Sequence, residues 1–243
     1  MKKTAMLILS TVLASAVCLP ALKAPDFEKV LKKGQARFAS LKDYTATTRK
    51  KELIGKNKYK EQWDIDFKFM KPFNIYARIG NGEAKGTEII FAKGKYNDKL
   101  VVHKNGLLGM VDIYLDPRSP LATEGERHPV HESYMGYTIE VLDKNFKMMK
   151  EKGKGEVSFV KEEIVDGRKT WHFKASFPPD EGFYAAVILM YFDQETCLLL
   201  KIQSFGWDGQ LREEYFFAKL KVNAGLTDQD FNIANPAYGF RKR

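Results

Sequence analysis

The residues best suited to chemistry lie in one polar segment, residues 123–132, with the sequence TEGERHPVHE. It offers His128, His131 and three glutamates, and imidazole and carboxylate groups are common metal ligands. The two histidines do not have the spacing of the helical HExxH motif, and Pro129 opposes a shared helical face. A metal-assisted hydrolase centred on these histidines is therefore one hypothesis. A loop anchored by hydrogen bonds of Arg127 and His128 fits the spacing better, so we predict no metal and no cofactor.

Other catalytic patterns are missing from the sequence. It holds no nucleophile elbow, phosphate-binding loop or dinucleotide-binding glycine pattern in a suitable context. Cys197 lies in an apolar, strand-like run without a neighbouring base, which is typical of an inert, buried thiol. Asp64 and Asp66 fall on the polar side of a strand, where water would solvate them. We therefore expect a protein that is not an enzyme.

The segment that organises the chain is residues 58–70, KYKEQWDIDFKFM. Apolar and polar side chains alternate along it almost without a break, which is the two-residue period of a half-buried strand. Trp63, Ile65, Phe67 and Phe69 would face one side. The pattern predicts a strand that presents one apolar face to a core or a cavity.

Similar strands follow at short intervals, and short connections favour an antiparallel meander. Residues 26–40 predict a helix capped by Asp26, and residues 132–151 predict a second helix. We expect about ten strands and an α+β, mostly β fold. The predicted strands are 44–53, 58–70, 73–79, 87–92, 99–103, 110–115, 157–165, 171–177, 184–192, 198–205 and 211–222.

The predicted apolar face holds more large side chains than two short helices easily cover. Either the helices and loops cover it fully, or a curved sheet encloses a cavity for acyl chains. In the second case the cavity would be lined by Trp63, Ile65, Phe67, Phe69, Phe73, Ile75, Ile89, Phe91, Trp171, Phe173 and Phe177.

The first 24 residues have the features of a cleaved signal peptide: a basic start, an apolar stretch and a small residue, Ala24, before the cut. We therefore predict export to the periplasm and one domain over residues 25–243. Lipid attachment at Cys18 is the alternative. Cleavage lowers the net charge from +9 to +6, because it removes three lysines and no acid. The basic residues are spread along the strands and either form a solvated face or, in an exported protein, would meet anionic membrane surfaces and not nucleic acid.

The chain resembles a group of uncharacterised bacterial exported proteins over most of residues 41–240. That group is similar to the outer-membrane lipoprotein-sorting proteins of the LolA/LolB-like fold. The resemblance is carried by YTATTRKKEL, KPFNIYARI, EIIFAKGKYNDKLVVH, LDPRSPLA, RHPVHE and DFNIANPAYGF. It implies a curved antiparallel half-barrel with helices on its concave side, around a cavity for lipid or lipoprotein acyl chains.

We therefore expect a periplasmic, non-enzymatic binding or carrier protein for lipid or lipoprotein acyl chains. Arg49 and Arg127 are the candidates for contact with the head group. The alternative is a cell-envelope sensor or protein-interaction module on the same fold. This module would bind an envelope protein. Besides acyl chains, the expected partners of the chain are thus the inner- or outer-membrane surface or an envelope protein.

Overall fold

The computed structural model describes residues 24–106 and 111–241. The predicted signal peptide lies outside these residues except for Ala24. Cys18, and Met110 at the start of a predicted strand, also lie outside them. Across the two described ranges, no helix combines the length and apolar character that a membrane crossing requires.

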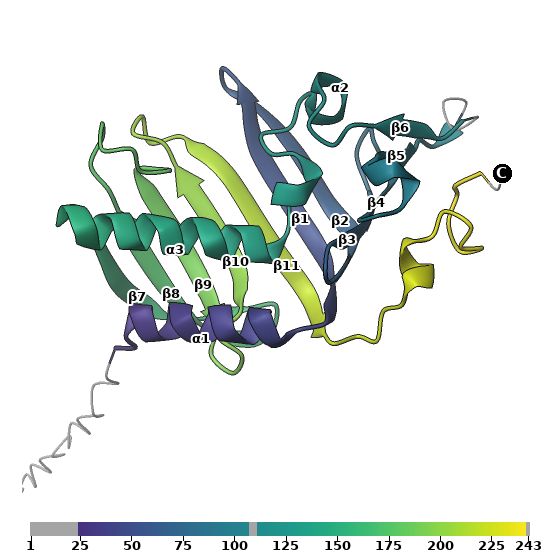
Figure 1. Ribbon diagram of the computed structural model, residues 1–243. Helices are drawn as coiled ribbons and strands as arrows, with labels where there is room; N and C mark the ends of the chain where they lie inside the picture. Colours follow the sequence, from purple (N-terminus) through teal and green to yellow (C-terminus); the bar gives the residue numbers. More distant parts are fainter. Residues whose placement is uncertain (1–23, 107–110, 242–243) are drawn as a thin grey trace, which may run out of the picture.

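In the described part of the chain, eleven strands form one antiparallel sheet that does not close on itself (Figure 1). The strand order is β6-β5-β4-β3-β2-β1-β11-β10-β9-β8-β7, so the pairing of β1 with β11 joins two meanders. The predicted antiparallel sheet with two main helices is confirmed. The strands are β1 (Asp43–Gly55), β2 (Lys58–Met70), β3 (Asn74–Arg78), β4 (Glu88–Ala92), β5 (Leu100–His103), β6 (Ile113–Leu115), β7 (Glu156–Val165), β8 (Arg168–Ser176), β9 (Val187–Asp193), β10 (Leu199–Phe205) and β11 (Leu211–Val222).

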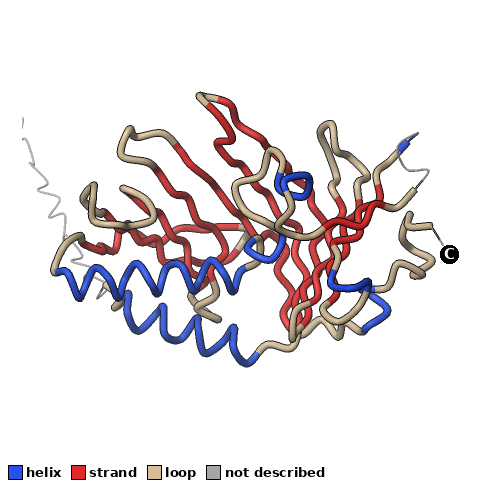
Figure 2. The backbone as a smooth tube through the Cα atoms, turned by 45° about the horizontal axis from the view of Figure 1, so that its top comes forward, coloured by secondary structure: helices blue, strands red, loops and turns tan. Residues whose placement is uncertain are grey.

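Two long helices, α1 (Phe27–Ser40) and α3 (Met135–Lys152), cover one face of the sheet in front of β7–β10 (Figures 1 and 2). We call this the inner face and the opposite one the outer face. Asp26 caps α1 as predicted, because its side chain accepts a hydrogen bond from the Lys29 amide at 3.1 Å. Gly153 ends α3 in the left-handed conformation that glycine adopts without strain.

Aromatic packing fixes both helices to the inner face. Phe27 of α1 contacts Phe146 of α3, Phe173 of β8 and Phe192 of β9, with ring centroids 5.1–6.1 Å apart. Gly34 lets α1 approach closely, because a Cβ atom there would lie 2.4 Å from the carbonyl oxygen of Cys197. This half of the inner face is therefore filled by the protein's own side chains.

A β-bulge in β2 changes which side chains face inward. Thr48 pairs with Ile65 but Lys50 pairs with Gln62, so two residues of β2 oppose one of β1. Asp64 has a φ of 54°, and an extra residue in a strand reverses the alternation of its side chains. The predicted inward position of Trp63 is thus corrected: its ring is 42% exposed on the outer face.

The C-terminal segment, predicted as a loop, packs on the outer face of β3–β5 (yellow in Figure 1). It contains a short 3₁₀ helix, η4 (Asp228–Phe231), and the fully buried Phe231. Tyr238 stacks on Tyr76 of β3 at a centroid distance of 4.1 Å. Both faces of this half of the sheet are therefore covered, although by different segments.

Candidate functional site

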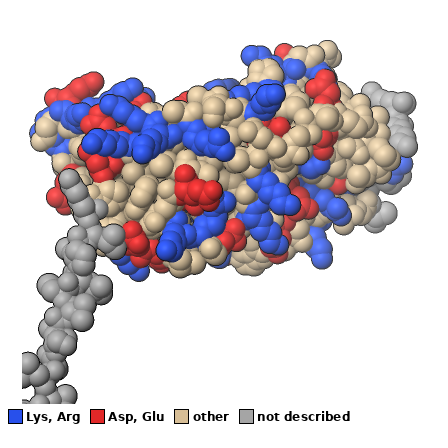
Figure 3. Space-filling model, turned by 90° about the horizontal axis from the view of Figure 1, so that it is seen from below, with Lys and Arg blue, Asp and Glu red and all other residues tan. Residues whose placement is uncertain are grey.

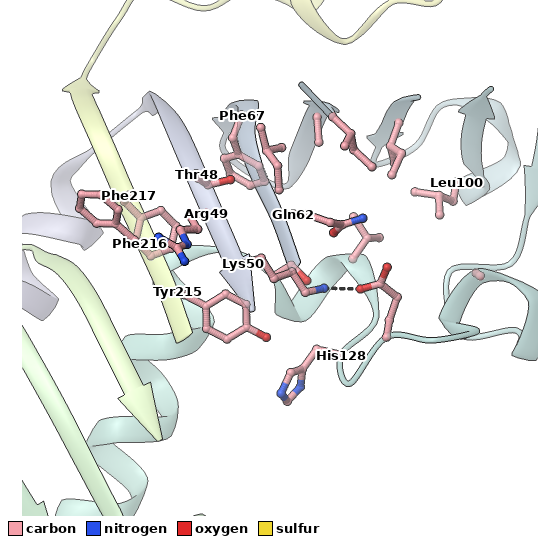
Figure 4. A pocket seen from close by; sticks show the side chains of 18 residues that line it. Thr48, Arg49, Lys50, Gln62, Phe67, Leu100, His128, Tyr215, Phe216 and Phe217 are labelled. Atoms are coloured by element: carbon pink, nitrogen blue, oxygen red, sulfur yellow. Dashed lines mark hydrogen bonds and ion pairs between the residues drawn. The ribbon is translucent and has the colours of Figure 1, made fainter. Parts of the chain in front are cut away.

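The inner face of β1–β5 is covered by an irregular segment, residues 119–134, which we call the strap. It holds α2 (Pro120–Thr123) and the 3₁₀ helix η3 (Val130–Glu132). Between strap and sheet lies a partly enclosed cavity of about 140 Å³ (Figure 4). Most of its wall is apolar, from Ile65, Phe67, Ala77, Ile79, Ile89, Leu100, Val130 and Phe217.

One end of the cavity is polar. Lys50 forms an ion pair with Glu126 of the strap, drawn as a dashed line in Figure 4, and Lys60 lies 2.5 Å from the other oxygen of that carboxylate. The bulge described above turns Lys60 and Gln62 toward this end. Burial alone would raise the pKa of Glu126, but the charges and hydrogen bonds of Lys50 and Lys60 together outweigh burial and lower that pKa. The pair therefore joins strap and sheet as charged groups.

Next to this end, two buried glutamates of the sheet hold the strap. Glu52 of β1 is 0% exposed and Glu213 of β11 is 6% exposed. The backbone amide of Arg127 donates to Glu52 at 3.1 Å. The side-chain Nε of Arg127 lies 3.3 Å from Glu213. His128 Nε2 lies 2.9 Å from the same Glu213 oxygen. The predicted anchoring of this loop by Arg127 and His128 is thereby confirmed.

Hydroxyl groups complete the cluster. Tyr184 donates to Glu213 Oε1 at 2.5 Å, Ser204 donates to the same oxygen at 2.9 Å, and Tyr215 donates to Glu52. Burial and the neighbouring carboxylates raise the pKa of both tyrosines, so they remain neutral donors. Buried carboxylates need such partners, because an unpaired buried charge is strongly unfavourable.

His128 is positioned to carry a proton in this cluster. Burial alone would lower its pKa, but the hydrogen bond and the charge of Glu213 outweigh burial and raise it. Its other ring nitrogen lies 3.2 Å from Glu132. In contrast, burial and the nearby Arg118 lower the pKa of His131, whose buried Nε2 has no partner among the described residues. The two histidines are therefore in different environments and do not form a pair.

The geometry of Glu52, His128 and Glu213 also bears on metal binding. One ligand atom from each lies within 4.8 Å of the others, which is close enough to surround an ion. However, Lys50 lies 3.2 Å from Glu52, and the Arg127 guanidinium contacts Glu213. These cations already neutralise the carboxylates and would repel a metal ion. The cluster is better suited to locking the strap than to metal-assisted hydrolysis.

The structure distributes the eleven predicted lining residues over several places. Ile65, Phe67 and Ile89 line the cavity. Phe69, Phe73 and Phe91 form an aromatic cluster with Tyr134 of the strap, with centroid distances of 4.9–5.9 Å. The inner core contains Ile75, Phe173 and Phe177, with Trp171 at its edge and Trp63 on the outer face.

The two predicted head-group arginines do not lie together. Arg127 is part of the buried cluster. Arg49 borders the cavity through its strand, but its guanidinium lies 3.7 Å from Glu214 and 5.4 Å from the centre of the Trp63 ring. Sequence reasoning missed Lys50, Glu52, Glu213 and Tyr215. Their position could have been inferred from the two-residue period of the strands. Lys50 and Glu52 fall on the same side of β1 as the buried Tyr44, and Glu213 and Tyr215 fall on the same side of β11 as the buried Phe217.

Comparison with known proteins adds one family assignment. The model of the family described as "Protein of unknown function (DUF1571)" matches residues 41–240. No curated protein matches the chain. The predicted membership of an uncharacterised family is confirmed by the family match.

Several solved structures align with the chain at low identity. Lipoprotein LppX from Mycobacterium tuberculosis aligns at 12% identity over 83% of this chain and 99% of that one, with a TM-score of 0.49. A LolA superfamily protein from Nitrosomonas europaea aligns at 12% identity over 84% and 96%, with a TM-score of 0.35. A putative outer membrane lipoprotein-sorting protein domain from Vibrio parahaemolyticus aligns at 14% over 84% and 97%, with a TM-score of 0.36.

Proposed function

The chain belongs to the DUF1571 family, whose function is unknown, and we propose that it binds the acyl chain of a lipid or lipoprotein. The cavity between strap and sheet would hold the chain. The protein would act as a periplasmic carrier or binding protein, in keeping with the signal peptide predicted for residues 1–24.

The apolar cavity is the observation that supports this proposal. Apolar side chains from strands and strap line a hollow of about 140 Å³, while the neighbouring half of the inner face is filled. An apolar cavity of about 150 Å³ holds one benzene ring, so this hollow would take roughly six methylene groups. Burying each CH₂ contributes about 0.8 kcal/mol, so affinity would come mainly from apolar contact.

The polar end would meet the head group of the ligand. Lys50 and Gln62 lie at this end and border the cavity, so they are better placed for this role than Arg49. Figure 4 shows Phe67 and Leu100 on one side of the hollow and His128 and Tyr215 on the other. A ligand with an apolar tail and a polar head would match both sides.

The test is a titration of the full chain with fatty acids of increasing length. We expect affinity to rise about fourfold for each added CH₂ and to level off when the hollow is full. Ala77→Leu places three more carbons in the hollow and should shorten the chain at which affinity levels off. Ala234→Leu, at an exposed position of the C-terminal segment, is the matched control.

Two results would contradict the proposal. The first is an affinity that does not depend on chain length. The second is an equal response of the Ala77→Leu and Ala234→Leu variants, because only the former changes the cavity.

A further inference from the structure

The outer face carries a second hollow, lined by a different kind of side chain. It measures about 400 Å³ and lies where β1, β2, β3 and β11 meet the C-terminal segment. We call it the basic groove. Its lining includes the side chains of Thr45, Thr47, Lys68, Arg78, Lys219 and Lys221.

Strand register explains why these side chains meet. Thr45 of β1 lies opposite Lys221 of β11 and Lys68 of β2, so one row of the outer face carries two lysines and a hydroxyl. Because odd positions of β1 before the bulge in β2 point outward, Thr47 lies on the same face in the next row. That row continues through Asp66 to Arg78 of β3.

A second bulge adds Lys219 to the groove. Thr45 pairs with Lys221 but Thr47 pairs with Ala218, so β11 has an extra residue here, and Lys219 has a φ of 51°. Bulges commonly redirect a side chain next to a functional site. Lys219 and Lys221 are both exposed, whereas Leu220 between them is buried.

Acidic neighbours partly offset the positive charge of the groove, and one of them, Asp166, accepts a hydrogen bond from the backbone amide of Lys219 at 2.6 Å. Lys68 is paired with Asp230 at 2.7 Å, and Arg78 lies 3.8 Å from Glu88. Lys219 and Lys221 form no ion pair with any described residue. Asp66 is the one acidic residue in the lining. On the face seen from below, basic and acidic side chains are interspersed (Figure 3).

We propose that the basic groove binds a phosphate group, either in a phospholipid head group or in a soluble phosphate ester. Lysine ammonium groups and the Arg78 guanidinium supply charged donors, and threonine hydroxyls supply neutral ones. The groove opens on the face opposite the apolar cavity. This site is therefore independent of the proposed acyl-chain binding.

The test uses sedimentation of the full chain with phosphatidylcholine vesicles that contain phosphatidylglycerol. The double variant Lys219→Gln/Lys221→Gln should bind roughly thirty-fold more weakly, since each lysine near an anionic surface contributes about a fivefold factor. Lys169→Gln/Lys174→Gln loses the same charge from exposed positions of β8 and should keep its binding. Lys219→Arg/Lys221→Arg should also keep it, which separates lost charge from misfolding.

Glycerol 3-phosphate distinguishes the two sources of phosphate. Displacement of the protein from vesicles shows that the groove takes soluble esters, and retention shows that it recognises head groups in the bilayer. Equal loss of binding in both Lys→Gln double variants would overturn the proposal. The proposal would also be overturned if the native chain bound neither the vesicles nor glycerol 3-phosphate. Ala77→Leu changes the cavity and not the groove, so it should leave vesicle binding unchanged. The acyl-chain proposal and the phosphate proposal can therefore fail independently of each other.

Discussion

The two halves of the inner face are covered in different ways. Over β7–β10, helices α1 and α3 pack through aromatic and aliphatic side chains, with Phe27, Phe173 and Phe192 in mutual contact. Over β1–β5, the strap is fixed through charged and polar groups, chiefly Arg127 and His128. The first half is filled, and the second retains a cavity.

This difference suggests that one half of the inner face serves the stability of the fold and the other serves ligand binding. Apolar packing favours complete filling, because every void loses contacts. Hydrogen bonds and ion pairs are directional, so a few buried anchors hold the strap at a distance from the sheet without filling the space below. The helical half would therefore carry most of the folding energy, and the strap half would carry the ligand.

The largest effect is expected from the filled half. Phe173 is 1% exposed, and Phe173→Ala should lower the free energy of unfolding by about 3–5 kcal/mol. Ile89 already borders the cavity and is only partly buried, so Ile89→Ala should cost about 1–2 kcal/mol. Urea denaturation measures both. Equal losses would show that the two halves do not differ as described.

An intermediate effect is expected from the anchor of the strap. Glu213→Gln removes the charge that pairs with His128 and Arg127, and should cost about 1.5–3 kcal/mol. Limited proteolysis should then cut the strap before the helices. Glu162→Gln, at an exposed position of β7, is the control and should be neutral. If the strap stays resistant to proteolysis in the Glu213→Gln variant, Glu213 does not anchor it.

The smallest effect is a dependence of stability on pH. The pKa of His128 is raised above its ordinary value of 6.5, so its contribution is complete below pH 6.5 and is lost as pH rises through the raised value. The pKa of Glu213 is lowered below 4.5, so its contribution is complete above pH 4.5 and is lost on acidification. Stability from this pair should therefore be greatest between about pH 4.5 and 6.5.

Thermal unfolding across pH 4–9 measures this dependence. His128→Gln should remove the loss of stability above pH 6.5, while His131→Gln should leave it in place. The reverse result would place the titrating group at His131.

Much of the fold could be predicted from local patterns. The cap at Asp26 and the alternation from Ile65 to Phe69 are local signals, and the structure confirms the elements they predict. Trp63 was misplaced because the bulge at Asp64 depends on Gly80 of the loop after β3. A Cβ atom at Gly80 would lie 2.3 Å from the Asp64 carbonyl oxygen.

The site was less predictable, because it joins residues far apart in the chain. Glu52 and Glu213 each lie in charged runs that suggest solvent exposure, but they pair across β1 and β11 on the inner face, where Arg127 of the strap contacts both. The C-terminal segment has no periodic pattern, yet Phe231 and Phe240 are buried on the outer face. Such contacts are determined by tertiary packing and not by local propensity.

The most direct test of acyl-chain binding is native mass spectrometry of the full chain purified from its host without added lipid. We predict a bound species with the mass of a lipid or acylated molecule, retained by Ala234→Leu and reduced in Ala77→Leu. The contradicting result is a protein that carries no lipid and takes up none from a broad panel of acyl chains.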